Sequence, residues 1–306
     1  MWVRVLGSAA GGGFPQWNCS CPNCRGARDG SVPCQPRTQS SIAVSSDYRH
    51  WFLFNASPDI RTQIEAFPPL QPQGQVRHSP IQAIVLTDAE LDHTIGLLSL
   101  RETRVLRIYA TGWVWTALTA WNPFLRTLAA FCEVDWQPVR LDESMTLRGV
   151  DGFDSGLECR ALITGSNKTV AFAPTAEPHP EATVGYRVTD SRTGQALVYV
   201  PGAQALTTEI ANQLRAGACV LFDGTCWEDD ELPQLGISGK TARAMGHVPI
   251  SGAHGSLEQL AVLNSARRVY IHINNTNPIL IENSPQRQAV LARGIEVAVD
   301  GMEMEI

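Results

Sequence analysis

The sequence lacks several features that would point to particular classes of protein. No stretch approaches ~18 consecutive apolar residues, the length that a membrane-spanning helix requires. The net charge is −6, with no run of like charge and no basic stripe, so neither a membrane nor a nucleic acid is an expected partner. No internal repeat or low-complexity segment is present. What remains is an ordinary globular composition, with 44% apolar and 18% charged residues.

The first residues also lack the layout of a signal peptide, in which a charged segment precedes an apolar one. Met1–Gly7 instead predicts a strand that begins almost at the first residue. We therefore expect a cytoplasmic protein. In that compartment the eight cysteines would be thiols or metal ligands rather than disulfides.

Short β-rich runs alternate with helical segments along the whole chain. Helices are predicted at Asp59–Phe67, Thr94–Arg101, Trp113–Ala120, Thr207–Ala216, Ser256–Asn264 and Ser284–Arg293. Strands are predicted at Val3–Leu6, Ser41–Ser45, Trp51–Asn55, Ala83–Leu86, Arg107–Ala110, Gly185–Thr189, Leu197–Val200, Cys219–Phe222, Val269–Ile273 and Glu296–Val299. This order predicts an α/β sandwich of mixed sheets with outer helices, in a single domain over residues 1–306.

Four potential metal ligands follow the apolar run Ala83–Leu86: Asp88, Glu90, Asp92 and His93. The apolar run predicts a fully buried strand, so the ligands would lie on the loop that leaves it. Converging carboxylates and imidazoles are what a divalent ion requires. If the segment were extended, Asp88, Glu90 and Asp92 would lie on the same side, and a turn in the loop would remove that relation.

A second group of potential ligands is the CxCxxC cluster Cys19, Cys21 and Cys24. Three thiolates within six residues can wrap one soft ion, and a tetrahedral zinc site then needs one further ligand. Cys34 or a distant histidine could supply it. We predict a structural zinc site that closes a loop rather than performing chemistry.

Other candidate residues lie at the ends of later strands and in loops. His272 ends a late strand, where a ligand from distant sequence would enter the cleft. Asp223 also ends an apolar strand and could face a metal or a substrate, although a turn aspartate before glycine is an equal alternative. His247 could line the cleft. His179 could contribute to the cleft or could equally be a solvated loop residue.

These residues together resemble the metallo-β-lactamase superfamily, whose signature is a strand followed by T-H-x-H-x-D-H-x-x-G. Thr87, Asp92, His93 and Gly96 match it, whereas Asp88 and Glu90 replace two histidines. The resemblance implies an αββα sandwich with a metal cleft at one edge. It places His272 on the last histidine ligand and His179 near the middle one, and the bridging aspartate would fall at Gly202 or Ala203.

The replacements resemble one branch of the superfamily, which serves pyrroloquinoline quinone biosynthesis. Several strings carry that resemblance, among them 6–19, 55–61, 86–93, 246–252 and 270–278. It implies an Fe(II) or other divalent ion held by Asp92, His93 and His272, with Glu90 or Asp88 as further candidates. It also implies oxygen-dependent hydroxylation of the tyrosine ring in a glutamate–tyrosine crosslinked precursor, and a homodimer.

Two alternatives stay open at this stage: a metal-dependent hydrolase and a non-catalytic carrier of the intermediate. The precursor is a charged small molecule, so its binding would call on polar side chains around the cleft. Loop position makes the following residues candidate contacts: Ser8, Gln16, Arg61, His179, Asp223 and His247.

Overall fold

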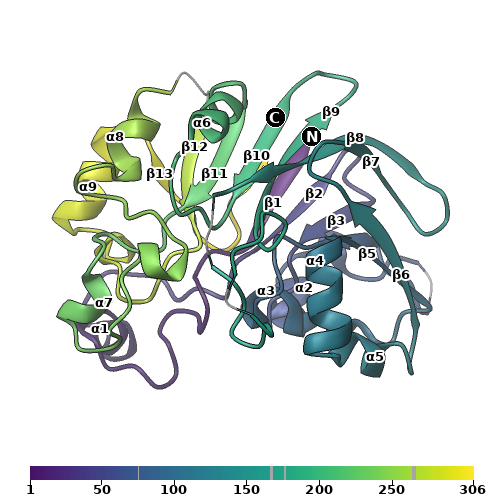
Figure 1. Ribbon diagram of the computed structural model, residues 1–306, viewed down its shortest axis with the longest axis horizontal. Coiled ribbons are helices and arrows are strands. Elements are labelled where there is room, and N and C mark those ends of the chain that lie inside the picture. The colour runs from purple at the N-terminus through teal and green to yellow at the C-terminus, as the bar shows by residue number, and fades with distance from the viewer. Residues whose placement is uncertain (75, 166–167, 176, 264–266) are drawn as a thin grey trace.

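The structure is a computed structural model that describes residues 1–74, 76–165, 168–175, 177–263 and 267–306 (Figure 1). Within these ranges the chain forms two mixed sheets of seven strands each. The first sheet has the order β14–β1–β2–β3–β4–β5–β6. Its strands are β1 (Trp2–Gly7), β2 (Ser41–Ser45), β3 (Trp51–Phe54), β4 (Ile81–Val85), β5 (Val105–Thr111), β6 (Glu133–Val139) and β14 (Glu303–Glu305).

The second sheet has the order β13–β12–β11–β10–β9–β8–β7. Its members are β7 (Ser144–Arg148), β8 (Asp154–Ile163), β9 (Val184–Asp190), β10 (Ala196–Val200), β11 (Cys219–Asp223), β12 (Arg267–Ile271) and β13 (Glu296–Val297). Strands β10 to β13 run parallel, whereas β9 pairs antiparallel with β10. Parallel neighbours bring the carboxyl ends of β11 and β12 to one edge, where Asp223 and His272 lie.

Helices α2, α4 and α5 cover the outer face of the first sheet, and α6, α8 and α9 cover that of the second (Figure 1). The α-helices are α1 (Pro22–Asp29), α2 (Ile60–Glu65), α3 (Leu91–Thr94), α4 (Gly112–Thr116), α5 (Phe124–Leu128), α6 (Thr208–Arg215), α7 (Glu231–Gln234), α8 (Ser256–Ala261) and α9 (Pro285–Ala292). Short 3-10 turns are η1 (Pro68–Leu70), η2 (Ile95–Leu100), η4 (Arg243–Met245) and η5 (Pro278–Leu280), and η3 (Ala117–Trp121) is a π-helix.

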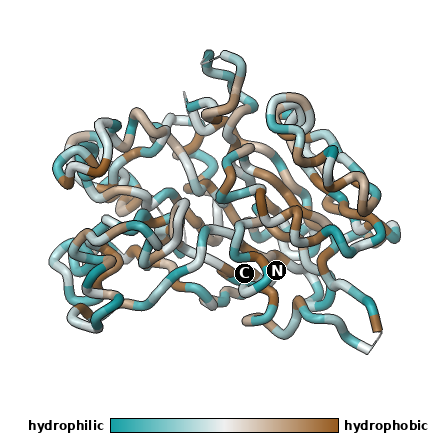
Figure 2. Tube along the Cα trace, turned by 90° about the horizontal axis from the view of Figure 1, so that it is seen from below, coloured by the Kyte–Doolittle hydropathy of each residue, from teal (hydrophilic) through white to brown (hydrophobic). Residues whose placement is uncertain are grey.

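Three apolar layers hold this arrangement together. The central layer lies between the sheets, where the Phe54 ring meets Tyr186 and Tyr199 edge-on at 5.6 and 6.0 Å. One outer layer packs the first sheet against α2, α4 and α5, and the other packs the second sheet against α6, α8 and α9. In Figure 2 the brown, hydrophobic segments are more frequent in the middle of the molecule and the teal, hydrophilic ones at its periphery. The predicted αββα sandwich is therefore confirmed.

The two termini lie side by side in both views (Figures 1 and 2). Strand β14 pairs antiparallel with β1, and the N-terminal amine of Met1 donates to the carbonyl of Ile306 at 2.7 Å. None of the described helices combines the length and apolar character that crossing a bilayer requires.

The secondary-structure predictions succeed best for the buried strands. Ile84, Val85 and Leu86 are fully buried, as the apolar run predicts. Strands β6, β7, β8 and β14 were not predicted, because their alternating or half-exposed residues lack a continuous apolar run. Among the predicted helix ends, Ser284 does cap α9, whereas Asp59 makes no capping bond. Asn264, the predicted end of the helix that begins at Ser256, lies outside the described residues.

The helix predicted from Thr94 to Arg101 is wrong in type. A short α-helix, α3, begins earlier at Leu91, and residues Ile95–Leu100 form the 3-10 turn η2. Gly96 donates its N–H to the carbonyl of Ala56 rather than to its own helix. That bond to a neighbouring segment interrupts the α-helical pattern.

Candidate functional site

The loop that joins β4 to α3 is held in place by Asn55, which lies at the end of β3. The Asn55 side chain accepts from the backbone N–H of Thr87 and donates to the Thr87 hydroxyl, each at 3.0 Å. Gly96 lies so close to this region that a Cβ would come within 2.1 Å of the Ser57 carbonyl oxygen. The residues that match the superfamily signature, Thr87 and Gly96, therefore fix the path of the loop and helix.

Because α3 begins at Leu91, the loop turns before Asp92 and His93. The extended alternation considered for Asp88, Glu90 and Asp92 is therefore wrong. The turn carries Asp92 and His93 to the end of β12. There the Asp92 Oδ2 atom lies 3.5 Å from His272 Nε2 and 3.7 Å from His93 Nε2.

These three side chains form a group with the geometry of a metal site. One ligand atom from each of Asp92, His93 and His272 lies within 4.8 Å of the others. His93 Nε2 is buried and has no hydrogen-bond partner among the described residues. A buried, unpaired imidazole nitrogen is costly, and a bound cation would satisfy it. The donors fit a divalent ion that prefers nitrogen and oxygen ligands.

Asp88 and Glu90 have other partners in this structure. Asp88 Oδ2 lies 2.7 Å from His93 Nδ1, the nitrogen on the far side of the ring from the site. This is the arrangement in which a carboxylate orients a metal-binding histidine. Glu90 forms an ion pair with Lys168 at 2.9 Å. Both residues therefore lie outside the group that Asp92, His93 and His272 form.

Charge in this region favours a cation. Burial opposes a charge on His93, but Asp88 and Asp92 raise the pKa of its imidazole to about 9. Burial likewise opposes a charge on Asp92, yet His93 and His272 hold the pKa of its carboxyl well below its usual range. The buried Asp88 carboxylate and the partly buried Asp92 carboxylate thus create a negative potential at the point that His93 Nε2 faces.

A second group shares His272 with the first. Asp223, His247 and His272 also bring one potential ligand atom each within 4.8 Å of the others. The Asp223 carboxylate contacts His247 Nδ1 at 2.8 Å, and the His247 and His272 rings stack with centroids 5.2 Å apart. The Thr225 hydroxyl lies 2.9 Å from His272 Nδ1 and so helps to orient that ring.

Two glycines allow backbone to approach these groups closely. A Cβ on Gly11 would lie 3.2 Å from Asp92 Oδ2, so the glycine-rich segment after β1 packs against the ligand. A Cβ on Gly202 would lie 3.5 Å from the His247 ring. Gly202 lines the cleft, whereas the neighbouring Ala203 donates its N–H to Asp223. Neither of the two positions predicted for the superfamily's bridging aspartate, Gly202 and Ala203, carries a carboxylate.

The cleft is a small cavity of about 40 Å³. It is lined by Asp88, Glu90, Asp92, His93, Lys168, Thr183, Gly202, Met245, Gly246, His247 and His272. Lys168, Thr183 and Met245 were not predicted, since nothing in their local sequence distinguishes them.

Several predicted substrate contacts lie away from this lining. Ser8 is fully buried and donates its hydroxyl to Asp300. Gln16 donates its amide to Asn18, and Arg61 is exposed at the start of α2. His179 is exposed too, and its Nδ1 accepts from the backbone N–H of Glu181. Asp223 is buried behind His247, so of this set His247 alone lines the cleft.

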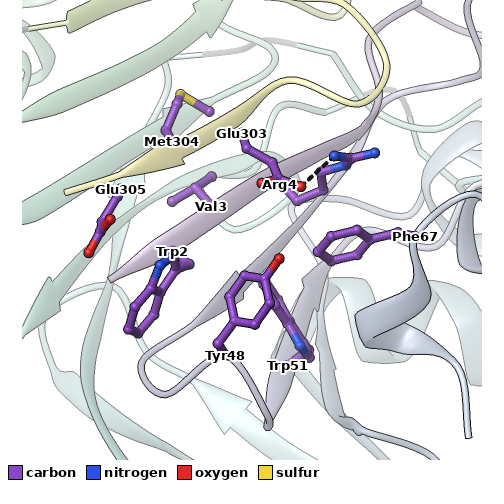
Figure 3. A pocket seen from close by; sticks show the side chains of 9 residues that line it. All are labelled: Trp2, Val3, Arg4, Tyr48, Trp51, Phe67, Glu303, Met304 and Glu305. Atoms are coloured by element: carbon purple, nitrogen blue, oxygen red, sulfur yellow. Dashed lines mark hydrogen bonds and ion pairs between the residues drawn. The ribbon is translucent and has the colours of Figure 1, made fainter.

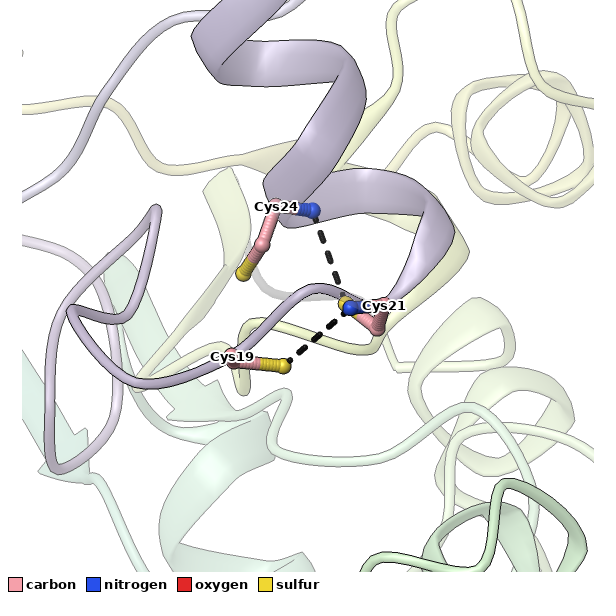
Figure 4. A group of neighbouring side chains, drawn as sticks. All are labelled: Cys19, Cys21 and Cys24. Carbon is pink, nitrogen blue, oxygen red and sulfur yellow. Dashed lines mark hydrogen bonds between the residues drawn. The ribbon is translucent and has the colours of Figure 1, made fainter.

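The CxCxxC cluster gathers at the start of α1 (Figure 4). Cys21 caps this helix, Pro22 occupies its first turn and Gly30 ends it in the left-handed conformation. The Sγ atoms of Cys19, Cys21 and Cys24 lie within 4.8 Å of one another, close enough to share one ion. Cys34 is not in this group. Cys132, Cys159 and Cys219 are buried among apolar residues of the core.

Asn275, which the sequence analysis missed, faces the three sulfurs. It is 5% exposed, and its amide nitrogen lies 3.2, 3.7 and 3.3 Å from the Sγ atoms of Cys19, Cys21 and Cys24. Its position three residues after His272 is the only signal that sequence offered.

A separate pocket lies at the β1–β14 edge of the first sheet (Figure 3). Its aromatic wall includes Tyr48 and Phe67, and the Arg4 guanidinium lies 4.6 Å above the Phe67 ring. Arg4 also pairs with Glu303. The chain's own guanidinium thus occupies the position that a cationic ligand would take.

The chain is similar to known proteins over its whole length. The Beta-lactamase superfamily domain matches residues 50–273. Coenzyme PQQ synthesis protein B of Azoarcus sp. (strain BH72) is 48% identical, and that of Methylococcus capsulatus (strain Bath) is 47% identical. The first match covers 100% of both chains and the second 99% of both.

A solved structure extends the similarity to three dimensions. The Zn(2+)-bound PqqB from Methylobacterium extorquens is 40% identical, with a TM-score of 0.88 over 100% of both chains. On this evidence the chain belongs to the metallo-β-lactamase superfamily and, within it, to the family of coenzyme PQQ synthesis protein B.

Proposed function

We propose that this protein is a metal-dependent enzyme of coenzyme PQQ synthesis, and that it hydroxylates the tyrosine ring of the glutamate–tyrosine crosslinked precursor. The role in PQQ synthesis follows from the names of its full-length relatives. The observation that carries the reaction type is the donor set of Asp92, His93 and His272. Two imidazoles and one carboxylate are the facial ligands of non-haem Fe(II) oxygenases.

The reaction needs a reductant as well as dioxygen. Conversion of one ring C–H bond to C–OH by O₂ takes up two electrons and two protons and releases one water. A two-electron donor, either the precursor itself or an external reductant, is therefore a co-substrate. A ferrous ion held by the three donors would supply the chemistry that activates dioxygen.

The remaining cleft residues would bind and orient the substrate. Lys168 places a positive charge in the cleft wall, where a substrate carboxylate can pair with it. His247, held by Asp223 at 2.8 Å, presents its ring beside His272 and can exchange a proton with the phenol. Asp88 keeps the His93 ring in place throughout.

A second candidate function is hydrolysis of an ester or phosphodiester. It is favoured by the zinc that the 40% identical PqqB structure contains, since zinc has no redox chemistry and activates water. Two features argue against it. Asp88 and Glu90 stand in place of two imidazoles, and neither Gly202 nor Ala203 offers the carboxylate that would bridge two zinc ions.

Anaerobic reconstitution separates these functions. The metal-free protein is loaded with Fe(II) in one sample and Zn(II) in another, and precursor, a two-electron reductant and then oxygen are added to each. A product heavier by one or two oxygen atoms in the iron sample alone supports the hydroxylase. Addition of water with cleavage in the zinc sample supports the hydrolase, and precursor bound but unchanged in both supports a carrier.

An Asp92→Asn variant tests whether Asp92 is a metal ligand, because it keeps the shape of the side chain and removes one charge from the donor set. Hydroxylation that persists in this variant at the parent rate would contradict the assignment of Asp92. The homodimer predicted from the resemblance stays a prediction, which sedimentation of the purified chain would test.

A further inference from the structure

A cavity of about 720 Å³ lies where β4 and β5 begin, and the turn after η2 forms part of its wall. The two strands run parallel, so their starts lie at one edge of the first sheet and the metal cleft lies beyond the other end of β4. The five residues of β4 separate the two edges by about 16 Å. The cavity is therefore distinct from the cleft. Its volume falls within the range of about 300–1,000 Å³ that is typical of ligand pockets.

Part of the cavity wall is apolar. Ile81, Leu100 and Leu106 line it, and all three belong to the outer apolar layer of the first sheet. At this edge of the sheet that layer therefore faces an open cavity. Apolar walls of this kind bind the hydrocarbon body of a ligand, while a few polar groups fix its orientation.

Gln82 is a buried polar group in the same wall. A register shift in the pairing of β3 with β4 leaves Gln82 without a partner on β3, and such bulges redirect a side chain. Gln82 is 8% exposed, and its Oε1 atom has no hydrogen-bond partner among the described residues. An unpaired buried amide group destabilises the folded protein. A ligand in the cavity can supply the missing partner to this amide.

The cavity lining has an excess of positive charge, although the chain as a whole has a net charge of −6. It contains three arginines, Arg77, Arg104 and Arg107, and Glu102 is its one carboxylate among the described residues. Arg107 already pairs with Asp135 at 2.7 Å. Arg104 is exposed and has no ion pair within the described part of the chain. Arg77 pairs with Glu102 at 3.4 Å, and an exposed pair of this kind is weak, so two guanidiniums are available to a ligand.

We propose that this cavity is a second binding site, and that its ligand is an aromatic acid. The ring system lies against the apolar wall, a polar substituent contacts the Gln82 amide, and a carboxylate pairs with Arg77 and Arg104. Guanidinium groups bind carboxylates through two parallel hydrogen bonds, which gives the pairing its geometry. The apolar wall selects against a purely ionic ligand, and the two arginines select against a neutral one. The inference does not depend on the metal in the cleft or on the reaction there.

Calorimetric titration of the full-length protein with three probes tests the ligand class without reference to turnover. Naphthalene dicarboxylate has both the ring and the charges, naphthalene dimethanol has the ring alone, and succinate has the charges alone. The dicarboxylate is expected to bind at least about tenfold more tightly than either of the others, since a hydrogen bond to a charged group contributes about that factor. Equal binding of the dimethanol would overturn the role of the arginines. Equal binding of succinate would show surface ion pairing only and overturn the site.

Arg104→Ala tests the place of binding. Because Arg104 is exposed, the variant is expected to fold, and its affinity for naphthalene dicarboxylate should fall by about tenfold. Arg126→Ala is the matched control, since Arg126 is an exposed arginine of α5 that does not line the cavity. The dicarboxylate should bind this variant with the parent affinity. Equal weakening in both variants would show a response to general surface charge and overturn the site.

Two further variants separate the cavity from the cleft. Gln82→Leu should weaken dicarboxylate binding and keep or raise the midpoint of thermal unfolding, because it removes a buried polar atom that has no partner among the described residues. Parent affinity in this variant would overturn the contact with the amide. Lys168→Ala should leave dicarboxylate binding unchanged, since Lys168 lines the cleft and not the cavity. Loss of binding in Lys168→Ala would place the probe in the cleft and overturn the second site.

Discussion

The cysteine group and the cleft group are built in opposite ways. Cys19, Cys21 and Cys24 lie within six consecutive residues, and the start of α1 alone brings their sulfurs together. Asp92, His93 and His272 come from segments about 180 residues apart and meet because β4 and β12 end at the same edge of the sandwich. The first group requires local structure, and the second requires both sheets.

The two groups also differ in donor chemistry. Soft thiolates suit a closed zinc site that contributes folding energy. Imidazoles and a carboxylate suit an ion that keeps open positions for substrate. The two ligand sets therefore favour different metal ions, and single substitutions in each set test that difference.

The largest expected effect on the cleft comes from His272→Ala. This substitution removes the donor that the two cleft groups share, so the cleft affinity for Fe(II) or Zn(II) should fall by more than about 100-fold, beyond the cost of outer-shell changes. The thiolate site should keep its metal. Isothermal titration and metal analysis measure both, and full cleft affinity in this variant would contradict the assignment.

Cys24→Ser is the corresponding change in the other group. Serine removes a thiolate, so the cysteine site should lose its zinc and the midpoint of thermal unfolding should fall, by about 1.5 °C for each kcal/mol lost in a chain of this length. Cys34→Ser is the control, because Cys34 lies outside the group. Equal zinc loss in both variants would show that Cys34 is a ligand.

Asp88→Asn tests whether Asp88 orients the His93 ring or binds the metal directly. The amide leaves His93 Nδ1 without its carboxylate partner, so cleft metal affinity should fall by about 10–100-fold, less than for His272→Ala. A loss as large as that of His272→Ala would show that Asp88 binds the metal directly. Competition with a chelator of known affinity gives the comparison.

Glu90→Gln should have the smallest effect. Its carboxylate pairs with the partly exposed Lys168, and such pairs contribute about 0–1 kcal/mol, or up to about fivefold in affinity. The same chelator competition measures it. Metal loss comparable to that of Asp88→Asn would restore Glu90 as a ligand, as its place in the signature first suggested.

Local patterns predicted much of the scaffold. The apolar run before Thr87 predicted the buried strand, and the CxCxxC spacing brought the three cysteines into one group. The roles of Asp88 and Glu90 could not be predicted, because their side chains are directed by a turn at Leu91. That turn depends on Ala56 and Ser57, which belong to another strand's end.

The sequence by itself determined the layered α/β class, the superfamily signature and the chemistry of each candidate ligand. Those depend on residue type and on short-range periodicity, which are written in consecutive residues. Only the tertiary structure decided that Asp88 supports His93, that His247 lies beside His272, and that Asn275 faces the sulfurs. The physical reason is that parallel strands and their loops bring together residues that are remote in sequence, and no local pattern encodes which side chains then meet.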